Sequence, residues 1–155
     1  MSFLEYEILP MTEADLDEVT LLERECFSVP WSRDSFEDVM KYSFLGGFCA
    51  RVKGELAGYG VFHSLFEDGE ILDIAVGKSF RGLGIAKKLM SLMESEAALR
   101  GACRMMLEVR VSNAAARRLY LGLGYKETGV RKNYYKNPTE DAILMEKVLC
   151  SEEKE

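Results

Sequence analysis

One stretch organises this sequence: Glu70-Ile71-Leu72-Asp73-Ile74-Ala75-Val76-Gly77-Lys78-Ser79-Phe80-Arg81-Gly82-Leu83-Gly84-Ile85-Ala86-Lys87-Lys88-Leu89-Met90. Residues 71–76 form a short apolar run rich in branched side chains, which is typical of a buried strand. The second part predicts a helix, because apolar residues recur close to a 3.6-residue period at Ile85, Leu89, Leu92, Met93 and Ala97. The stretch therefore predicts a buried strand followed directly by an amphipathic helix.

The connection between strand and helix contains Arg81, Gly82 and Gly84. Glycines just before a helix leave backbone N–H groups uncovered, and the first N–H groups of the helix have no partner within it. Together with the helix dipole and the cations Arg81, Lys87 and Lys88, they suit a phosphate or pyrophosphate. An ordinary strand-to-helix turn that needs glycine for its shape explains the connection equally well at this point.

Two common phosphate-binding motifs are absent from the sequence. The dinucleotide fingerprint G-x-G-x-x-G would require glycine where Lys87 stands. The nucleoside-triphosphate loop G-x-x-x-x-G-K-[ST] occurs nowhere in the chain. What remains is the pattern Arg81-x-x-Gly84-x-Ala86, so nicotinamide and ATP chemistry are disfavoured.

Composition sets further bounds. At 155 residues the chain predicts one domain over residues 1–150, with residues 151–155 as a disordered acidic tail. A net charge of −6 argues against nucleic-acid binding. Four cysteines without C-x-x-C spacing and one histidine predict neither a disulfide framework nor a metal site. No signal peptide or membrane-spanning run is visible, so we expect a cytoplasmic protein without a membrane partner.

The remaining elements follow from hydrophobic periodicity and helix-capping residues. We expect strands over residues 6–9, 47–53, 56–66, 105–109, 125–132 and 142–148, and helices over 13–27 and 33–42 and after Ser112 or Asn113. Residues 67–70 are expected to form a turn and residues 133–140 a polar loop. This order predicts an α/β fold with a mixed sheet of six or seven strands, flanked by about four helices.

Several residues stand out against this background. Glu108 is a carboxylate inside an apolar strand, where burial costs free energy unless the group is paired. It is either a general base or the ion-pair partner of Arg110, and the residues alone favour the ion pair. Pro30 and Trp31 lie between two helices, where Trp31 is better explained as a packing anchor than as a functional group. The adjacent Tyr134 and Tyr135 are expected to line a binding site.

With these patterns together, the chain resembles the GCN5-related N-acetyltransferase (GNAT) superfamily, and within it the RimI-type ribosomal-protein-alanine N-acetyltransferases. The superfamily signature R/Q-x-x-G-x-G/A is present as Arg81 to Ala86, with alanine at the last position. The subfamily patterns are Phe27-Ser28-Val29-Pro30-Trp31-Ser32, Leu107-Glu108-Val109-Arg110-Val111-Ser112-Asn113-Ala114-Ala115-Ala116, Leu119-Tyr120-x-x-Leu123-Gly124-Tyr125 and Arg131-Lys132-Asn133-Tyr134-Tyr135. They occur in the order and at the separations of the family.

The resemblance implies that acetyl-CoA binds where two central strands splay apart. Its pantetheine arm would lie against Ile74, Ala75 and Val76, and its pyrophosphate on the backbone of Gly82, Leu83, Gly84, Ile85, Ala86 and Lys87. Arg81 and Asn113 would complete the cofactor site. In this family Glu108 matches the general base and Tyr120 the general acid that protonates the leaving thiolate, so the resemblance now favours a catalytic Glu108.

The implied reaction is direct acetyl transfer, in a ternary complex, to the N-terminal α-amine of a protein, with the N-terminal alanine of a small-subunit ribosomal protein as the best match. An α-amine has a pKa of about 7.7–8.0 against about 10.4 for lysine, so its deprotonation costs roughly 3–4 kcal/mol less.

The acceptor peptide would enter between Pro30-Trp31 and Tyr134-Tyr135, and the enzyme would be a monomer or a weak dimer. Other protein N-termini, a lysine side chain and a small amine remain alternatives, whereas a non-catalytic CoA-binding domain would not be expected to keep both Glu108 and Tyr120.

Overall fold

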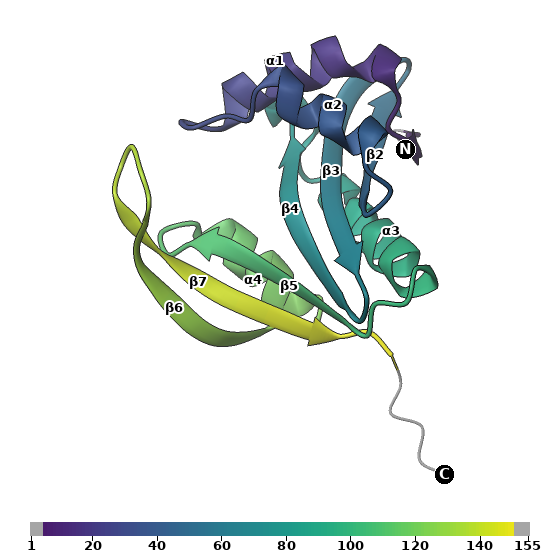
Figure 1. Ribbon diagram of the computed structural model, residues 1–155. Coiled ribbons are helices and arrows are strands. Elements are labelled where there is room, and N and C mark those ends of the chain that lie inside the picture. The colour runs from purple at the N-terminus through teal and green to yellow at the C-terminus, as the bar shows by residue number, and fades with distance from the viewer. Residues whose placement is uncertain (1–4, 151–155) are drawn as a thin grey trace.

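The computed structural model describes residues 5–150, which form one sheet with helices on both faces (Figure 1). The strands are β1 (Glu7–Pro10), β2 (Leu45–Val52), β3 (Glu55–Leu65), β4 (Asp68–Val76), β5 (Arg104–Arg110), β6 (Lys126–Tyr135) and β7 (Glu140–Val148). The α-helices are α1 (Leu16–Cys26), α2 (Arg33–Lys41), α3 (Ile85–Leu99) and α4 (Ala114–Gly122), and two short 3-10 helices cover Glu13–Asp15 and Lys78–Phe80. The predicted mixed α/β fold is confirmed, and the acidic tail at 151–155 lies outside the described residues.

The seven strands lie in the order β1-β2-β3-β4-β5-β7-β6. Every neighbouring pair is antiparallel except β4 and β5, which run parallel. The parallel pairing covers only Asp68–Glu70 against Arg104–Met106, although β4 continues to Val76 and β5 to Arg110. Beyond this short junction the two strands separate, as Figure 1 shows, and the predicted splay in the sheet is confirmed.

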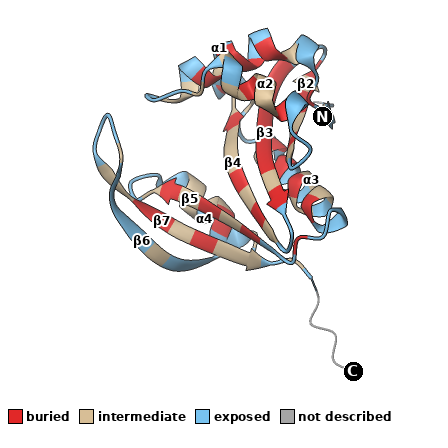
Figure 2. Cartoon of the chain, viewed as in Figure 1, coloured by how far each residue is buried: buried red, intermediate tan, exposed pale blue. Residues whose placement is uncertain are grey.

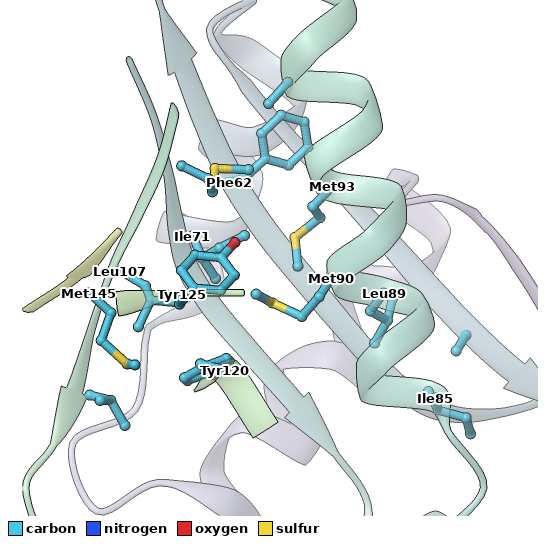
Figure 3. Close-up of a cluster of buried hydrophobic side chains, with 14 of the residues drawn as sticks. Phe62, Ile71, Ile85, Leu89, Met90, Met93, Leu107, Tyr120, Tyr125 and Met145 are labelled. Carbon is cyan, nitrogen blue, oxygen red and sulfur yellow. The ribbon is translucent and has the colours of Figure 1, made fainter. Parts of the chain in front are cut away.

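Helices pack on both faces of the sheet, around two hydrophobic clusters. Helices α3 and α4 cover one face, where Leu89, Met90, Met93 and Tyr120 pack against Phe62 and Leu107 (Figure 3). Helices α1 and α2 cover the opposite face over β2–β4, around Leu16, Val19, Phe36 and Tyr59. The edge strand β6 is largely exposed (Figure 2). The apolar positions of the sequence therefore account for both layers.

The end of the Met93 side chain on α3 lies directly over a glycine of the sheet. A Cβ atom on Gly60 of β3 would lie 2.5 Å from the methyl carbon of Met93. Real Cβ atoms do not come that close to a neighbour, so a side chain at this position would make the flexible end of Met93 shift.

The helices begin at N-capping residues that the sequence predicts. Thr12 forms a capping box with Asp15, and the Ser32 side chain accepts a hydrogen bond from the backbone N–H of Ser35. Of the two candidates before α4, Asn113 is the cap, since its side chain accepts from the N–H of Ala116 at 3.1 Å.

Two sequence-based expectations were wrong. The predicted turn at 67–70 is shorter and lies around Phe66, which has a φ of +56°. Asp68, Gly69 and Glu70 are not part of it, because they already pair with β3 and β5. Tyr134 and Tyr135 belong to β6 rather than to a loop, because Tyr135 pairs with Glu140 across the hairpin. Polar residues and a proline made this hairpin loop look longer than it is.

Within residues 5–150, none of the helices is both long and apolar enough to cross a membrane.

Candidate active site

A cavity of about 510 Å³ lies beside the end of β4, beyond the point where β5 has separated from it. Its walls come from the end of β4, the start of α3 and the inner side of α4. The lining residues are Cys26, Phe27, Ile74, Ala75, Val76, Phe80, Arg81, Gly82, Gly84, Ile85, Ala86, Lys87, Asn113, Ala115, Ala116, Leu119 and Tyr120. The structure thus brings together every residue that the resemblance implied for the cofactor except Leu83, which is 37% exposed and absent from the lining.

The entrance of α3 presents its backbone to this cavity. Gly82 and Gly84 have φ values of +82° and +83°, and a Cβ atom on either residue would meet no other atom within 4 Å. No side chain caps the N-terminus of α3, so its first N–H groups stay available. Arg81 donates from Nε to the Val76 carbonyl at 3.0 Å, which fixes the turn against the end of β4. The arrangement is that of an anion-binding helix N-terminus.

Tyr120 of α4 is 7% exposed and lines the same cavity. Burial raises the pKa of its phenol to about 12, and the nearby Asp73 carboxyl adds to the effect. The phenol therefore keeps its proton at neutral and moderately alkaline pH, and it can act as a proton donor toward the cavity.

Glu108 lies on the other face of the sheet. Its neighbours Leu107 and Val109 point into the cluster under α3 and α4, so the pleat of β5 directs Glu108 away from them. The ion pair with Arg110, which the residues alone favoured as the alternative to a catalytic role, does not form, because the Arg110 guanidinium turns to Glu140 at 3.2 Å and to the carbonyls of the hairpin loop. Instead, Glu108 Oε2 lies 2.8 Å from Nε of Arg131 on β6.

A smaller cavity of about 200 Å³ surrounds Glu108. It is lined by Glu70, Met106, Leu107, Glu108, Thr128, Arg131, Leu144, Met145 and Glu146. Tyr134 borders this region: the nearby Glu108 carboxylate raises the pKa of its phenol, and the Arg131 guanidinium lies 5.6 Å from its ring centroid. Tyr135 stacks edge-on against Tyr134, with ring centroids 5.1 Å apart. Glu108 and the two tyrosines thus form one cluster.

Pro30 and Trp31 lie in the connection between α1 and α2. Pro30 is exposed, whereas the Trp31 ring packs 5.1 Å from Phe36, as expected of a packing anchor. Neither residue lines the large cavity. The sequence had suggested them as a wall for the acceptor, and the structure leaves them on the face of the sheet that also carries Glu108.

Several lining residues were not identified from the sequence, among them Cys26, Phe27 and Leu119. The helical period already placed Cys26 and Leu119 on the inner faces of their helices, but nothing separated a cavity wall from ordinary core. Among residues 5–150, no group of three or more histidine, cysteine, aspartate or glutamate side chains is placed to hold a metal ion.

The comparisons with known proteins agree with this geometry. The model of the acetyltransferase (GNAT) family matches residues 16–125, and the chain belongs to this family of acetyltransferases.

Within the family, the chain is similar to proteins named for one substrate. It is 34% identical over 132 residues to a putative [ribosomal protein bS18]-alanine N-acetyltransferase of Bacillus subtilis, covering 84% of this chain and 87% of the relative. The crystal structure of the Escherichia coli ribosomal-protein-S18-alanine N-acetyltransferase superposes with a TM-score of 0.87 at 28% identity, covering 97% and 99% of the two chains. The fold is also that of Arabidopsis thaliana NAA60 in complex with acetyl-CoA, with a TM-score of 0.85 at 18% identity and coverage of 94% and 99%.

Proposed function

We propose that this acetyltransferase moves the acetyl group of acetyl-CoA to the N-terminal α-amine of a protein, and that its acceptor is the N-terminal alanine of a ribosomal protein. The observation that carries the proposal is the cavity between the end of β4 and α4, with an anion-binding helix entrance at one end and the protonated Tyr120 in its wall. The relatives named for ribosomal protein bS18 support the choice of acceptor.

The residues at the helix entrance fit a CoA pyrophosphate. The N–H groups of Gly82 to Lys87 can donate to its oxygens, and Arg81 and Lys87 in the cavity lining supply positive charge. The apolar side chains of Ile74, Val76 and Leu119 offer a surface for a pantetheine chain. The Oδ1 of Asn113 is occupied in capping α4, which leaves its amide N–H₂ as the group that can reach the ligand.

Gly84→Ala is expected to raise the KM for acetyl-CoA several-fold and to lower the free energy of unfolding by about 1–2 kcal/mol, since a Cβ is unfavourable at a positive φ. Steady-state kinetics and urea unfolding measure the two effects. Gly122→Ala in α4 is the matched control, because it also has free space around it but no positive φ. An unchanged KM for acetyl-CoA in the Gly84 variant would remove the cofactor from the α3 entrance.

We assign the acceptor to the face that carries Glu108, between the α1–α2 connection and the end of β6. The Glu108 carboxylate can receive the proton that an ammonium must lose before its nitrogen gains a free lone pair. A cation already lies there, since Arg131 is bound to Glu108 at 2.8 Å. Arg131 is 56% exposed on an edge strand, so an incoming α-ammonium can take its place against the same carboxylate.

The proposed transfer is a single displacement through a tetrahedral intermediate. The amine nitrogen attacks the thioester carbonyl carbon after its proton passes to Glu108, directly or through water. The C–S bond then breaks, and Tyr120 donates its phenolic proton to the departing thiolate, which gives free CoA. The nitrogen loses its second proton to water as the amide forms, and the Tyr120 phenolate regains a proton from solvent. No cysteine is needed as a nucleophile, so no acyl-enzyme forms.

The decisive experiment measures thiol release from acetyl-CoA with two peptides. One carries a free N-terminal alanine, and the other has a blocked N-terminus and an internal lysine. We expect turnover with the first peptide only. Turnover with the lysine peptide alone, or with neither, would overturn the acceptor assignment while leaving the CoA site to be tested separately.

Replacing both Tyr134 and Tyr135 by alanine is expected to raise the peptide KM by about tenfold or more, because two aromatic contact surfaces are lost. The KM for acetyl-CoA should change much less, since neither ring lines the large cavity. Tyr42→Ala is the control, as Tyr42 is also a partly exposed tyrosine paired with another ring. Equal effects on both KM values would contradict the role of the tyrosine pair.

We further propose that the enzyme works in the cytoplasm as a monomer or weak dimer and does not bind nucleic acid directly. The net charge of −6 supports the last point, because it opposes attraction to phosphate backbones and favours a basic protein as partner.

A further inference from the structure

Glu23 on α1 is only 2% exposed, the lowest value among the charged residues described. It occupies an inward position of the helix, in line with Leu16 and Val19. Removing a carboxylate from water costs several kcal/mol unless hydrogen bonds replace the lost hydration. Its partners should therefore indicate why the residue is there.

Two donors meet the Glu23 carboxylate. The Tyr59 phenol on β3 donates to Oε1 at 2.6 Å, and the backbone N–H of Trp31 donates to Oε2 at 2.9 Å. Glu23 thereby ties the α1–α2 connection to the central sheet. The segment held in this way is the one that carries Pro30 and Trp31.

Asp73 supplies the third contact, from the part of β4 that has separated from β5. Its carboxyl adjoins that of Glu23, and its Oδ2 is buried with no hydrogen-bond partner. Two adjacent buried carboxylates do not both stay charged, so one of them keeps a proton. Burial and the adjacent Glu23 raise the pKa of Asp73 to about 9, so Asp73 is neutral at pH 7.

We propose that Glu23 and Asp73 share a proton and together hold the Trp31 segment against β4, as positioning residues for the acceptor. The inference rests on the proposed function in one respect, that the Trp31 segment borders the acceptor. It deepens that function by connecting the acceptor wall to the strand that lines the acetyl-CoA cavity: Asp73 directly precedes Ile74, a residue of the cavity lining.

Above about pH 9 the pair would carry two negative charges, and their repulsion should release the Trp31 segment. The other titratable groups facing the pair are Tyr59, Cys26 and Tyr120. Burial raises the pKa of all three above its ordinary value, and Arg81 lies beside the Cys26 thiol. Asp73 is thus expected to titrate first, and a Cys26→Ser background removes the nearest alternative.

Trp31 is the only tryptophan in the chain, so its fluorescence reports on this segment alone. In the wild-type protein without substrate, we expect a red shift of the emission and stronger acrylamide quenching as the pH rises through about 9. Asp73→Asn should abolish this transition, because an amide N–H₂ donates to Glu23 at every pH. At pH 7 the Trp31 emission of the Asp73→Asn variant should equal that of the wild type.

Glu23→Gln replaces a charged acceptor by a neutral amide, so the hydrogen bonds from the Tyr59 phenol and the Trp31 N–H lose their charge-assisted strength. We expect its Trp31 emission to be red-shifted already at pH 7, and its peptide KM to rise about tenfold while the KM for acetyl-CoA changes less than about twofold. Glu25→Gln, exposed on the same helix, is the control and should leave all three values unchanged.

The proposal is overturned if the wild type and Asp73→Asn show the same pH dependence of Trp31 emission, or if Glu23→Gln changes both KM values equally. Should Glu23→Gln fail to fold, the comparison with Asp73→Asn still decides. Because the fluorescence is measured without substrate, failure of every peptide to react would refute the proposed function but not the held Trp31 segment.

Discussion

Glu108→Gln is expected to lower kcat by about 10²- to 10⁴-fold, the range associated with loss of a general base, with little change in either KM. Glutamine has nearly the shape of glutamate but cannot take a proton from the acceptor amine. It also loses the charged partner of Arg131, which is partly exposed, so the effect on stability should be small. Steady-state kinetics with the alanyl peptide and a thermal melt measure the two effects.

The matched control is Glu146→Gln. Glu146 lines the same small cavity, but its carboxylate pairs with Arg104 at 3.3 Å. This variant should keep kcat within about threefold, because an exposed ion pair contributes little. A Glu108 variant as active as the Glu146 variant would show that solvent alone removes the proton.

Tyr120→Phe is expected to lower kcat by about 10²-fold, since the thiolate would then leave without a proton from the protein. The pH profile carries a second expectation. With the pKa of Tyr120 raised to about 12, its protonated fraction is full below that pH and is lost only as the pH rises through it. The rate should therefore show no alkaline decline from Tyr120 between pH 7 and about 10.

Tyr125→Phe separates a catalytic effect from a packing effect. The Tyr125 ring lies 6.0 Å from that of Tyr120, and its hydroxyl donates to Glu94 at 2.8 Å, outside the large cavity. Losing this hydrogen bond should cost about 1 kcal/mol of stability and leave kcat nearly unchanged. If Tyr120→Phe behaves in the same way, its phenol is structural and another group protonates the thiolate.

The central strand and the helix after it could be predicted from sequence because both signals are local. The apolar run becomes β4, and the 3.6-residue period becomes α3 with glycine at its entrance. The helix caps Thr12, Ser32 and Asn113 are local signals as well. The separation of β4 from β5 has no such signal: it depends on where the pairing stops, and it was expected only through the family resemblance.

Side-chain partners across the sheet were the least predictable feature. From the residues alone, the partner favoured for Glu108 was Arg110 on the same strand face, whereas the fold brings Arg131 to it from β6, two strands away in the sheet. Glu23 and Asp73 went unnoticed for a related reason. A single acid in an amphipathic helix and another beside an apolar run are each unremarkable until the fold places them in contact.

The short parallel junction of β4 and β5 has a thermodynamic consequence. Past Glu70, no strand among residues 5–150 pairs with the open side of β4. The backbone N–H and C=O groups on that side are therefore left to solvent or to a ligand. A molecule that occupies this gap in the folded chain alone adds RT ln(1 + [L]/Kd) to the free energy of unfolding. Resistance to unfolding then varies with the concentration of that molecule, so the cellular supply of ligand becomes one determinant of how long the folded protein survives.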